Sequence, residues 1–384
     1  MKTLSIPGVY LDAIRLQPKL SLWTGVPIFL GIGHWDNNED EPSLSPKAFT
    51  RFEDFEPFWV GTDSYLKAII QGFFVNGGKL CYVLPMVDNK ADTLRQHLEQ
   101  LQRLEDIDLV CAPDLIESGD SVDDVVAKQA QILEHCMLMG DRFAILDGMK
   151  KTSQLEQQKQ RLQSSYGALY FPWLSAPEPG TLTSSSPKIY LPPCGHVAGI
   201  YARSDANIGV HKAPANELIE GISSLHTYLS NPVQTRLNDD QDTRGSVNFI
   251  RSLPGRGIRI WGARTLSPDP KLRCVNVRRL IITVRRWLER HLANLVFEPN
   301  TSDLWAIAKR DVTVYLSGLL QQGALRGPEP EKAFYVKCDG ENNPATVRDA
   351  GQLVVDIGLA PVEPGEFIRV RLVQSAHGST LDVV

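Results

Sequence analysis

The chain has 384 residues, which is enough for two or three domains with a large core. It is 42% hydrophobic and 22% charged with a formal net charge of −5, and this balance excludes a strongly basic nucleic-acid binder and a disordered acidic chain. No stretch reaches the roughly 18 apolar residues of a membrane span, and the N-terminus lacks the apolar region of a secretion signal. We therefore expect a protein that is made in the cytoplasm and does not insert itself into a membrane.

The first twenty residues contain one short β pattern, which runs from Val9 through Tyr10 and Leu11 to Asp12 and has a proline on either side. A lone strand of this kind has little to pack against locally, so its backbone groups need a sheet elsewhere. We interpret residues 1–20 as an arm.

The region after this arm alternates between helical and strand patterns. Residues 27–33 form a continuous apolar run, which is typical of a strand buried on both faces, and a polar loop follows at 34–46. The expected helices are 65–75, 94–104, 122–139 and 153–163, and the expected strands are 80–84, 107–112, 142–147 and 168–171. This alternation predicts an α/β fold: a three-layer α/β domain with a largely parallel sheet.

The end of this domain is less regular. A loop rich in proline and serine is expected at 175–188, a helix start at Gly195 and a strongly polar loop at 238–245. Apolar and polar side chains alternate from Gly257 to Gly262, which predicts a half-buried strand.

The C-terminal third predicts a smaller α+β domain, because two helical patterns precede two strand patterns. A helix is expected at 277–296, with one apolar face made by Leu280, Ile281, Val284, Leu288, Leu292 and Leu295. A second helix is expected at 302–322, followed by strands at 334–338 and 353–357. The last predicted strand, 367–374, places Ile368, Val370 and Leu372 on one side, and the polar tail at 375–384 is expected to be flexible.

Five arginines lie between residues 278 and 290, and Arg279, Arg286 and Arg290 share one face of the predicted helix. A run of this kind is typical of a solvated helix face. A nucleic-acid groove is disfavoured because Trp287 is the only aromatic residue among them.

Catalytic, metal and cofactor motifs are weak in this sequence. There is no Gly-x-Ser-x-Gly elbow, and the strongest hydrolase candidates are His196, Ser204 and Asp205, although a helix-start histidine that is satisfied by backbone groups is favoured. Cys194 and His196 could supply two metal ligands at most. The six cysteines occur without Cys-x-x-Cys spacing, which predicts free thiols. We expect no enzyme, no metal and no cofactor.

Several long blocks resemble one known family. The strings GHVAGIYARSD, PGRGIRIWGARTLS, KLRCVNVRRL and DAGQLVVDIGLAPVEPGEFIRVRL are similar to contractile tail sheath proteins, which form the outer sleeve of contractile phage tails and related injection systems. The resemblance covers nearly the whole chain, is densest from residue 247 to 365 and is looser between 88 and 150. Cys274 stands where the family usually has an aromatic residue, and the loop at 238–245 is more acidic than the family pattern.

The resemblance implies a domain plan and a structural role. It implies a linking arm at 1–20, an outer subtilisin-like α/β domain at 21–262, an inner α+β domain at 263–366 and a second linking arm at 367–384. Such a subunit polymerises as a helical homo-oligomer of six-fold rings around an inner tube protein, meets baseplate and terminal cap proteins, and contracts. It is assembled in the bacterial cytoplasm and contacts no nucleic acid.

The resemblance also implies roles for two groups of residues. The strands at Val9–Asp12 and 367–373 would join a sheet of neighbouring subunits, and Arg279, Arg286 and Arg290 would face the inner tube. Two alternatives from other classes stay open at this point: an α/β hydrolase, and a baseplate or adhesion module that is not a sheath.

Overall fold

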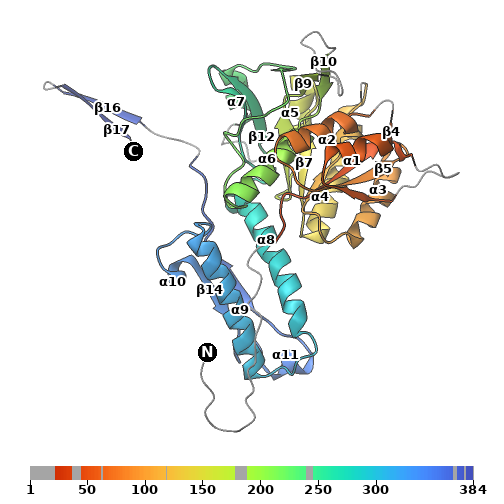
Figure 1. Cartoon of the computed structure of the whole chain (residues 1–384). Helices are drawn as coiled ribbons and strands as arrows, with labels where there is room; N and C mark the ends of the chain where they lie inside the picture. Colours follow the sequence, from red (N-terminus) through yellow and green to blue (C-terminus); the bar gives the residue numbers. More distant parts are fainter. Residues whose placement is uncertain are drawn as a thin grey trace, which may run out of the picture.

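The computed structural model describes residues 22–36, 45–61, 64–117, 119–177, 188–238 and 245–365, together with the backbone of 370–375 and 378–383. These residues form a larger and a smaller body, and Figure 1 shows a long helix, α8 (Val275–Leu292), that runs from one to the other. The predicted arm at Val9–Asp12 and the predicted strand residue Ile368 lie outside the described residues.

A sheet of eight strands forms the centre of the larger body. Its order is β13 (Gly257–Trp261), β12 (Val247–Leu253), β8 (Gly167–Phe171), β7 (Phe143–Asp147), β6 (Leu109–Cys111), β1 (Pro27–Ile32), β5 (Cys81–Met86) and β3 (Lys47–Phe49). The six inner strands are parallel, whereas the edge strands β3 and β13 are antiparallel to their neighbours. The prediction of a largely parallel sheet is confirmed.

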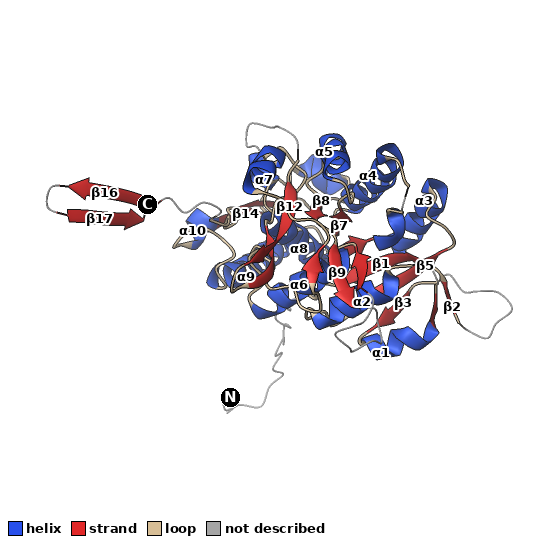
Figure 2. Cartoon of the chain, turned by 90° about the horizontal axis from the view of Figure 1, so that it is seen from above, coloured by secondary structure: helices blue, strands red, loops and turns tan. Residues whose placement is uncertain are grey.

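Both faces of this sheet are covered by helices, and each face has its own apolar core (Figure 2). One core contains α2 (Leu66–Val75) and α6 (Cys194–Asn207), and the other contains α3 (Ala91–Gln100), α4 (Val122–Met139) and α5 (Thr152–Arg161). Strand β7 is apolar from Phe143 to Leu146 because both of its faces are covered: Phe143 and Ile145 enter the first core, while Ala144 and Leu146 enter the second.

The helix boundaries in this body follow local sequence signals. Helix α4 has the predicted bounds, because the Ser121 hydroxyl accepts a hydrogen bond from the N–H of Asp124 and Gly140 ends the helix at a φ of 69°. Helix α2 ends at the predicted Asn-Gly-Gly turn, where Gly77 has a φ of 99°.

Two predicted loops contain short strands. In the expected loop at 34–46, β2 (His34–Trp35) pairs with β4 (Trp59–Val60), which follows the short helix α1 (Phe52–Phe55). At the edges of the expected loop at 175–188, β9 (Leu174–Pro177) pairs with β10 (Lys188–Leu191) and with β11 (Ser224–Leu225), ahead of α7 (Asn231–Leu237). The loop predictions are wrong at these positions because strands of two to four residues are too short to give a period.

The smaller body is built around the far half of α8. It contains α9 (Ser302–Gln321), α10 (Pro330–Ala333), β14 (Phe334–Lys337), α11 (Ala345–Asp349) and β15 (Asp356–Leu359). Strands β14 and β15 pair antiparallel, and a separate apolar core joins them to α8 and α9. The mixed helix and strand content agrees with the predicted α+β domain, although the second strand begins three residues later than expected.

The C-terminal end forms a hairpin that Figure 1 shows well away from both bodies. Strand β16 (Val370–Ser375) pairs antiparallel with β17 (Gly378–Val383), so that Leu372 lies opposite Leu381. The prediction of a strand at 367–374 is therefore confirmed for its described part. The prediction of a flexible tail at 375–384 is wrong for residues 378–383, because β16 gives this polar segment a partner strand.

All six cysteines are buried free thiols, as predicted. No helix in the described part of the chain is both long and apolar enough to cross a membrane.

Helices α2 and α6 meet at two glycines of the GHVAG block. A Cβ atom on Gly195 would lie 2.5 Å from the carbonyl oxygen of Ile69, and one on Gly199 would lie 2.4 Å from the carbonyl oxygen of Phe73. Both distances are far below ordinary contact, so the spacing of these two helices depends on the missing side chains.

We predict that Gly199→Leu lowers the free energy of unfolding by about 3 kcal/mol or more, because the new side chain would push α6 off α2. Urea denaturation followed by circular dichroism measures this change. Ala206→Leu is the matched control, since Ala206 is exposed on the same helix and should change stability by less than about 0.5 kcal/mol. Equal stability of the two variants would contradict the close-packing account.

Candidate domain junction

The strongest polar cluster in the structure lies where α8 leaves the larger body. Arg279, Arg286 and Arg290 share one face of this helix, as predicted, but the face is turned toward the larger body rather than toward solvent. Arg279 and Arg286 are 2% and 3% exposed. The expectation that these two arginines are free to meet a partner surface is therefore wrong.

Arg279 forms a buried ion triad with two carboxylates of the larger body. Its Nη1 and Nη2 atoms donate to the two oxygens of Asp205 at 2.8 and 2.6 Å, and Nη2 also lies 3.0 Å from Oδ2 of Asp108. Asp108 in turn accepts hydrogen bonds from the backbone N–H groups of Gly25 and Val26. The triad therefore joins α8, α6, the start of β6 and the segment that leads into β1.

The charges of this triad are strongly coupled. Burial opposes the charge of Arg279, but Asp205 and Asp108 outweigh it and raise the pKa of the guanidinium above its ordinary value. The Arg279 guanidinium also lies 4.8 Å from the ring centre of Tyr201, and the Tyr201 hydroxyl hydrogen-bonds that of Tyr170 at 2.6 Å. Such a network stabilises the fold only while Arg279 is present, because a buried carboxylate without a cation is costly.

The other two arginines hold the segment that precedes β6. Arg286 donates to the carbonyl oxygens of Trp23, Glu105 and Asp106, each at 3.3 Å. Arg290, whose side chain is 39% exposed, donates to the Glu105 carbonyl at 2.7 Å and to the Asp106 carboxylate at 3.1 Å. Both arginines therefore bind the chain at Glu105 and Asp106.

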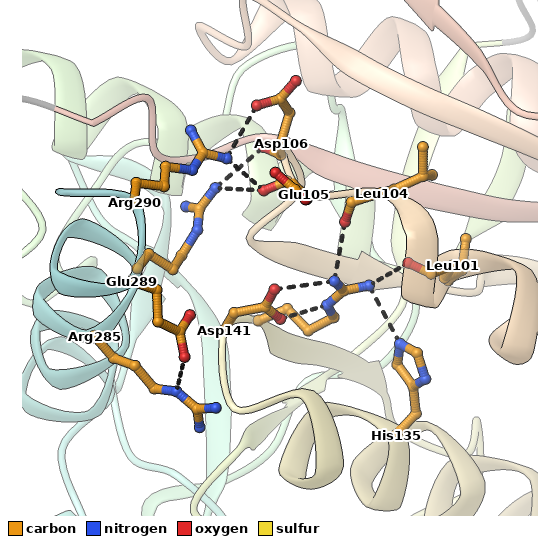
Figure 3. A network of polar contacts seen from close by, with 11 residues as sticks. Leu101, Leu104, Glu105, Asp106, His135, Asp141, Arg285, Glu289 and Arg290 are labelled. Atoms are coloured by element: carbon orange, nitrogen blue, oxygen red, sulfur yellow. Dashed lines mark hydrogen bonds and ion pairs between the residues drawn. The ribbon is translucent and has the colours of Figure 1, made fainter. Parts of the chain in front are cut away.

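A third arginine, Arg142, binds the same segment, and Figure 3 labels its partners Leu101, Leu104 and Asp141. Arg142 is fully buried and donates to the carbonyl oxygens of Leu101 and Leu104 at 2.9 and 3.0 Å, while Asp141 balances its charge. Residues 101–108 are thus fixed between β7 and α8. By contrast, the Arg285–Glu289 pair in the same view is half exposed and contributes only about 0.3–0.5 kcal/mol.

The apolar face of α8 packs as predicted for four of its six residues, whereas Ile281 and Leu295 are not part of this core. Leu280 and Val284 are buried in the core of the smaller body, with Leu288 and Leu292 packed against it. The sequence did not predict the contact made by Trp287, whose ring stacks on Tyr315 of α9 with the ring centroids 3.9 Å apart. Helix α8 therefore belongs to both bodies at once.

A sequence signal for the triad does exist. Asp108 stands between Ile107 and Leu109 in an otherwise apolar strand, and all three residues are buried. A carboxylate in such a position needs a cation partner, so the pattern predicts a buried arginine or lysine beside it. It does not say which one, because the partner lies 171 residues away in the sequence.

The hydrolase candidates do not form a catalytic arrangement. His196 is buried against Gly72, where a Cβ atom would lie 2.3 Å from its ring, and burial lowers the pKa of the imidazole to about 4. No hydrogen bond in the described part of the chain joins it to Ser204 or to Asp205, which is held by Arg279. Its Nδ1 atom has no partner, so the expectation that backbone groups satisfy this histidine is wrong for that atom.

Two buried carboxylates lie at the carboxyl ends of the parallel strands. Asp114, after β6, accepts hydrogen bonds from the N–H groups of Ile32 and Tyr65 and from the Ser64 hydroxyl. In open parallel sheets, ligands usually bind in the crevice where the strand order reverses, which here lies between β1 and β6. Asp114 holds the chain's own Ser64–Tyr65 segment at this crevice.

The second carboxylate, Asp147 at the end of β7, accepts the N–H of Cys194 at 2.8 Å and so caps α6. Burial raises the pKa of Asp147 to about 7, although the hydrogen bonds from Cys194 oppose the shift. Among the described residues, no group of three histidine, cysteine, aspartate or glutamate side chains is placed to hold a metal ion.

Two family models match the chain in consecutive segments. The phage tail sheath central domain matches residues 93–266, and the phage tail sheath C-terminal domain matches residues 267–375. The boundary between them falls just before α8. This chain belongs to the contractile tail sheath protein family.

Solved structures of this family resemble the chain over nearly its whole length. The sheath of an extracellular contractile injection system (PVC) in its contracted state has a TM-score of 0.78 and 27% identity, covering 98% of this chain and 99% of that one. The anti-feeding prophage (AFP) baseplate structure gives a TM-score of 0.77 and 26% identity, covering 97% and 99%.

A curated relative, the tail sheath protein of Salmonella phage ViI, is 28% identical over 176 residues. That match includes 45% of this chain but only 26% of the relative. The chain thus spans about a quarter of the length of this phage protein, whereas it matches the injection-system structures from end to end.

We predict that Arg279→Met costs about 3–5 kcal/mol of folding stability, because it leaves Asp108 and Asp205 buried without their cation. Arg285→Met, an exposed change on the same helix, is the matched control and should cost less than about 0.5 kcal/mol. Denaturant unfolding measures both. In the double variant Arg279→Met with Asp205→Asn, part of the loss should return, and strict additivity would contradict the coupling.

A second prediction concerns pH. Since the pKa of Asp147 is raised to about 7 in the fold, the folded state binds a proton that the unfolded state releases near pH 4, and stability should fall between about pH 4 and pH 8. Asp147→Asn should remove this part of the slope and stabilise the protein by about 1–3 kcal/mol at pH 8. Thermal melts at several pH values measure it, with the exposed change Asp92→Asn as control. An unchanged slope in Asp147→Asn would count against the buried proton.

Proposed function

We propose that this chain is the sheath subunit of a contractile, phage-tail-like injection particle. The observation that carries the proposal is its end-to-end likeness to a sheath subunit from a contracted injection system, at 27% identity and a TM-score of 0.78. In this role the chain polymerises helically in six-fold rings around an inner tube protein and contracts to drive the tube through a target envelope. It meets a baseplate and a terminal cap, and the particle is assembled in the bacterial cytoplasm.

The domain plan follows the same proposal. Residues 21–262 form a three-layer outer domain, residues 263–366 form the inner domain, and residues 1–20 and 367–384 are linking arms. The hairpin of β16 and β17 supports the C-terminal arm, because it pairs only with itself among the described strands. Strand addition between neighbours would satisfy its open edges while leaving the globular bodies free to turn.

The inner-tube contact needs a different surface from the one predicted. Arg279 and Arg286 are committed to the domain junction, and Arg290 donates to Glu105 and Asp106. We place the tube contact on the smaller body without assigning it to these arginines. A hydrolase is not favoured, because no hydrogen bond among the described residues joins its candidate residues and the family is structural.

The test is electron microscopy of the purified chain in negative stain. We expect rods with a hollow axis, in the contracted form, because no inner tube is present to hold an extended lattice. Chains lacking residues 1–14 or residues 367–384 serve as variants and should remain folded monomers by circular dichroism and sedimentation. Persistent monomers of the full chain would contradict the sheath role, and rods of normal length from either truncation would contradict the role of that arm.

A further inference from the structure

Two patches of opposite charge lie at the two ends of the central sheet. At one end, β12 and β13 form a ribbon that presents a basic patch, which we define as Arg251, Arg256, Arg259, Trp261 and Tyr228. At the other end, beside β3, the segments of β2, α1 and β4 present an acidic patch, which we define as Asp36, Glu53, Glu56, Phe58 and Val60.

The basic patch places like charges next to each other. Arg251 and Arg259 are directly paired across β12 and β13, so two like charges face each other, an arrangement that destabilises a strand pair. Their hydrogen bonds, and that of Arg256, go to amide and carbonyl oxygens of Asn231, Asn216 and the chain itself, so no carboxylate among the described residues neutralises them. An acidic surface that met this face would offset this repulsion.

Apolar side chains accompany these arginines. Trp261 is 40% exposed, and the Arg251 guanidinium lies 5.9 Å from its ring centre. Tyr228 is 66% exposed and lines a surface hollow together with Leu229, Arg251 and Ser252. Arginine and aromatic side chains gathered in this way are characteristic of protein interfaces.

The acidic patch has the complementary composition. Glu53 and Glu56 are exposed and form no ion pair with any described residue, and the N–H of Asp36 donates to the carbonyl of Phe58, which brings the third carboxylate alongside. Phe58 and Val60 are 51% and 37% exposed. An apolar contact rimmed by charge is therefore available at this end as well.

One chain cannot bring its own two patches together. They lie at opposite edges of an eight-stranded sheet, which at about 4.8 Å per strand spacing puts them roughly 34 Å apart. Figure 2 shows α1, β2 and β3 on one side of the larger body, with β12 displaced toward the other. Two different surfaces that match each other on one rigid body produce head-to-tail contacts, which close into rings or continue as helices.

We propose that the basic patch of one copy of this chain binds the acidic patch of the next copy, so that larger bodies join side by side in the assembly. The inference rests on the proposed sheath function and adds to it the identity of the two surfaces. Individual exposed ion pairs are weak, so the contact becomes strong through repetition over many copies. It weakens with salt.

The experiment uses two charge-reversed chains and their mixture. In the first, Arg251→Glu is combined with Arg259→Glu, so that both of its patches are acidic; in the second, Glu53→Arg is combined with Glu56→Arg, so that both are basic. Each alone should need a roughly tenfold higher concentration to assemble in sedimentation assays. Mixed in equal amounts they should co-assemble at the wild-type concentration, because each chain then supplies the partner that the other needs.

The matched control is Arg95→Glu with Arg103→Glu, which makes the same charge change at two exposed arginines of α3 and the turn after it, outside both patches. This control should assemble like the wild type. Circular dichroism shows whether each variant is folded. Wild-type assembly of the two reversed chains, or folded chains whose mixture fails to assemble, overturns the inference while leaving the sheath function standing. A wild-type chain that never assembles would overturn the sheath function itself.

Discussion

The structure depends on one buried charge that belongs to neither body alone. Arg279 extends from α8 into the larger body, where Asp108 and Asp205 neutralise it at distances of 2.6–3.0 Å. Because removing Arg279 leaves two carboxylates buried without a cation, the fold depends on this arginine. The angle at which α8 leaves the larger body is therefore set by electrostatics as well as by packing.

Much of the fold follows from local sequence rules. The capping serine and terminal glycine of α4 fix both of its ends, and continuous apolar runs such as 143–146 identify strands that are covered on both faces. These signals act over a few residues, so a sequence displays them directly. The strands of two or three residues were missed because they are held by tertiary pairing, such as that of Trp35 with Trp59, rather than by their own pattern.

The sequence predicts which arginines share a face of α8, but it does not predict what that face contacts. Helical periodicity correctly places Arg279, Arg286 and Arg290 on one face, but it does not give the direction in which that face points. The direction is decided by carbonyl groups at Trp23, Glu105 and Asp106, which lie 180 or more residues away. Every residue has a backbone carbonyl oxygen, so the amino-acid sequence does not show which of them accept these hydrogen bonds. The family resemblance identified the helix but not the surface that it meets.

The buried triad and the exposed ion pairs of this molecule differ in the free energy that is needed to break them. Breaking the buried triad costs about 3–5 kcal/mol, whereas an exposed pair between copies costs about 0–1 kcal/mol and is screened by salt. A load applied to an assembly of such chains will therefore rearrange contacts between copies before it bends the junction within one copy. On the proposed function, the two bodies of each subunit move as one unit, and the change of lattice takes place at its surfaces and arms.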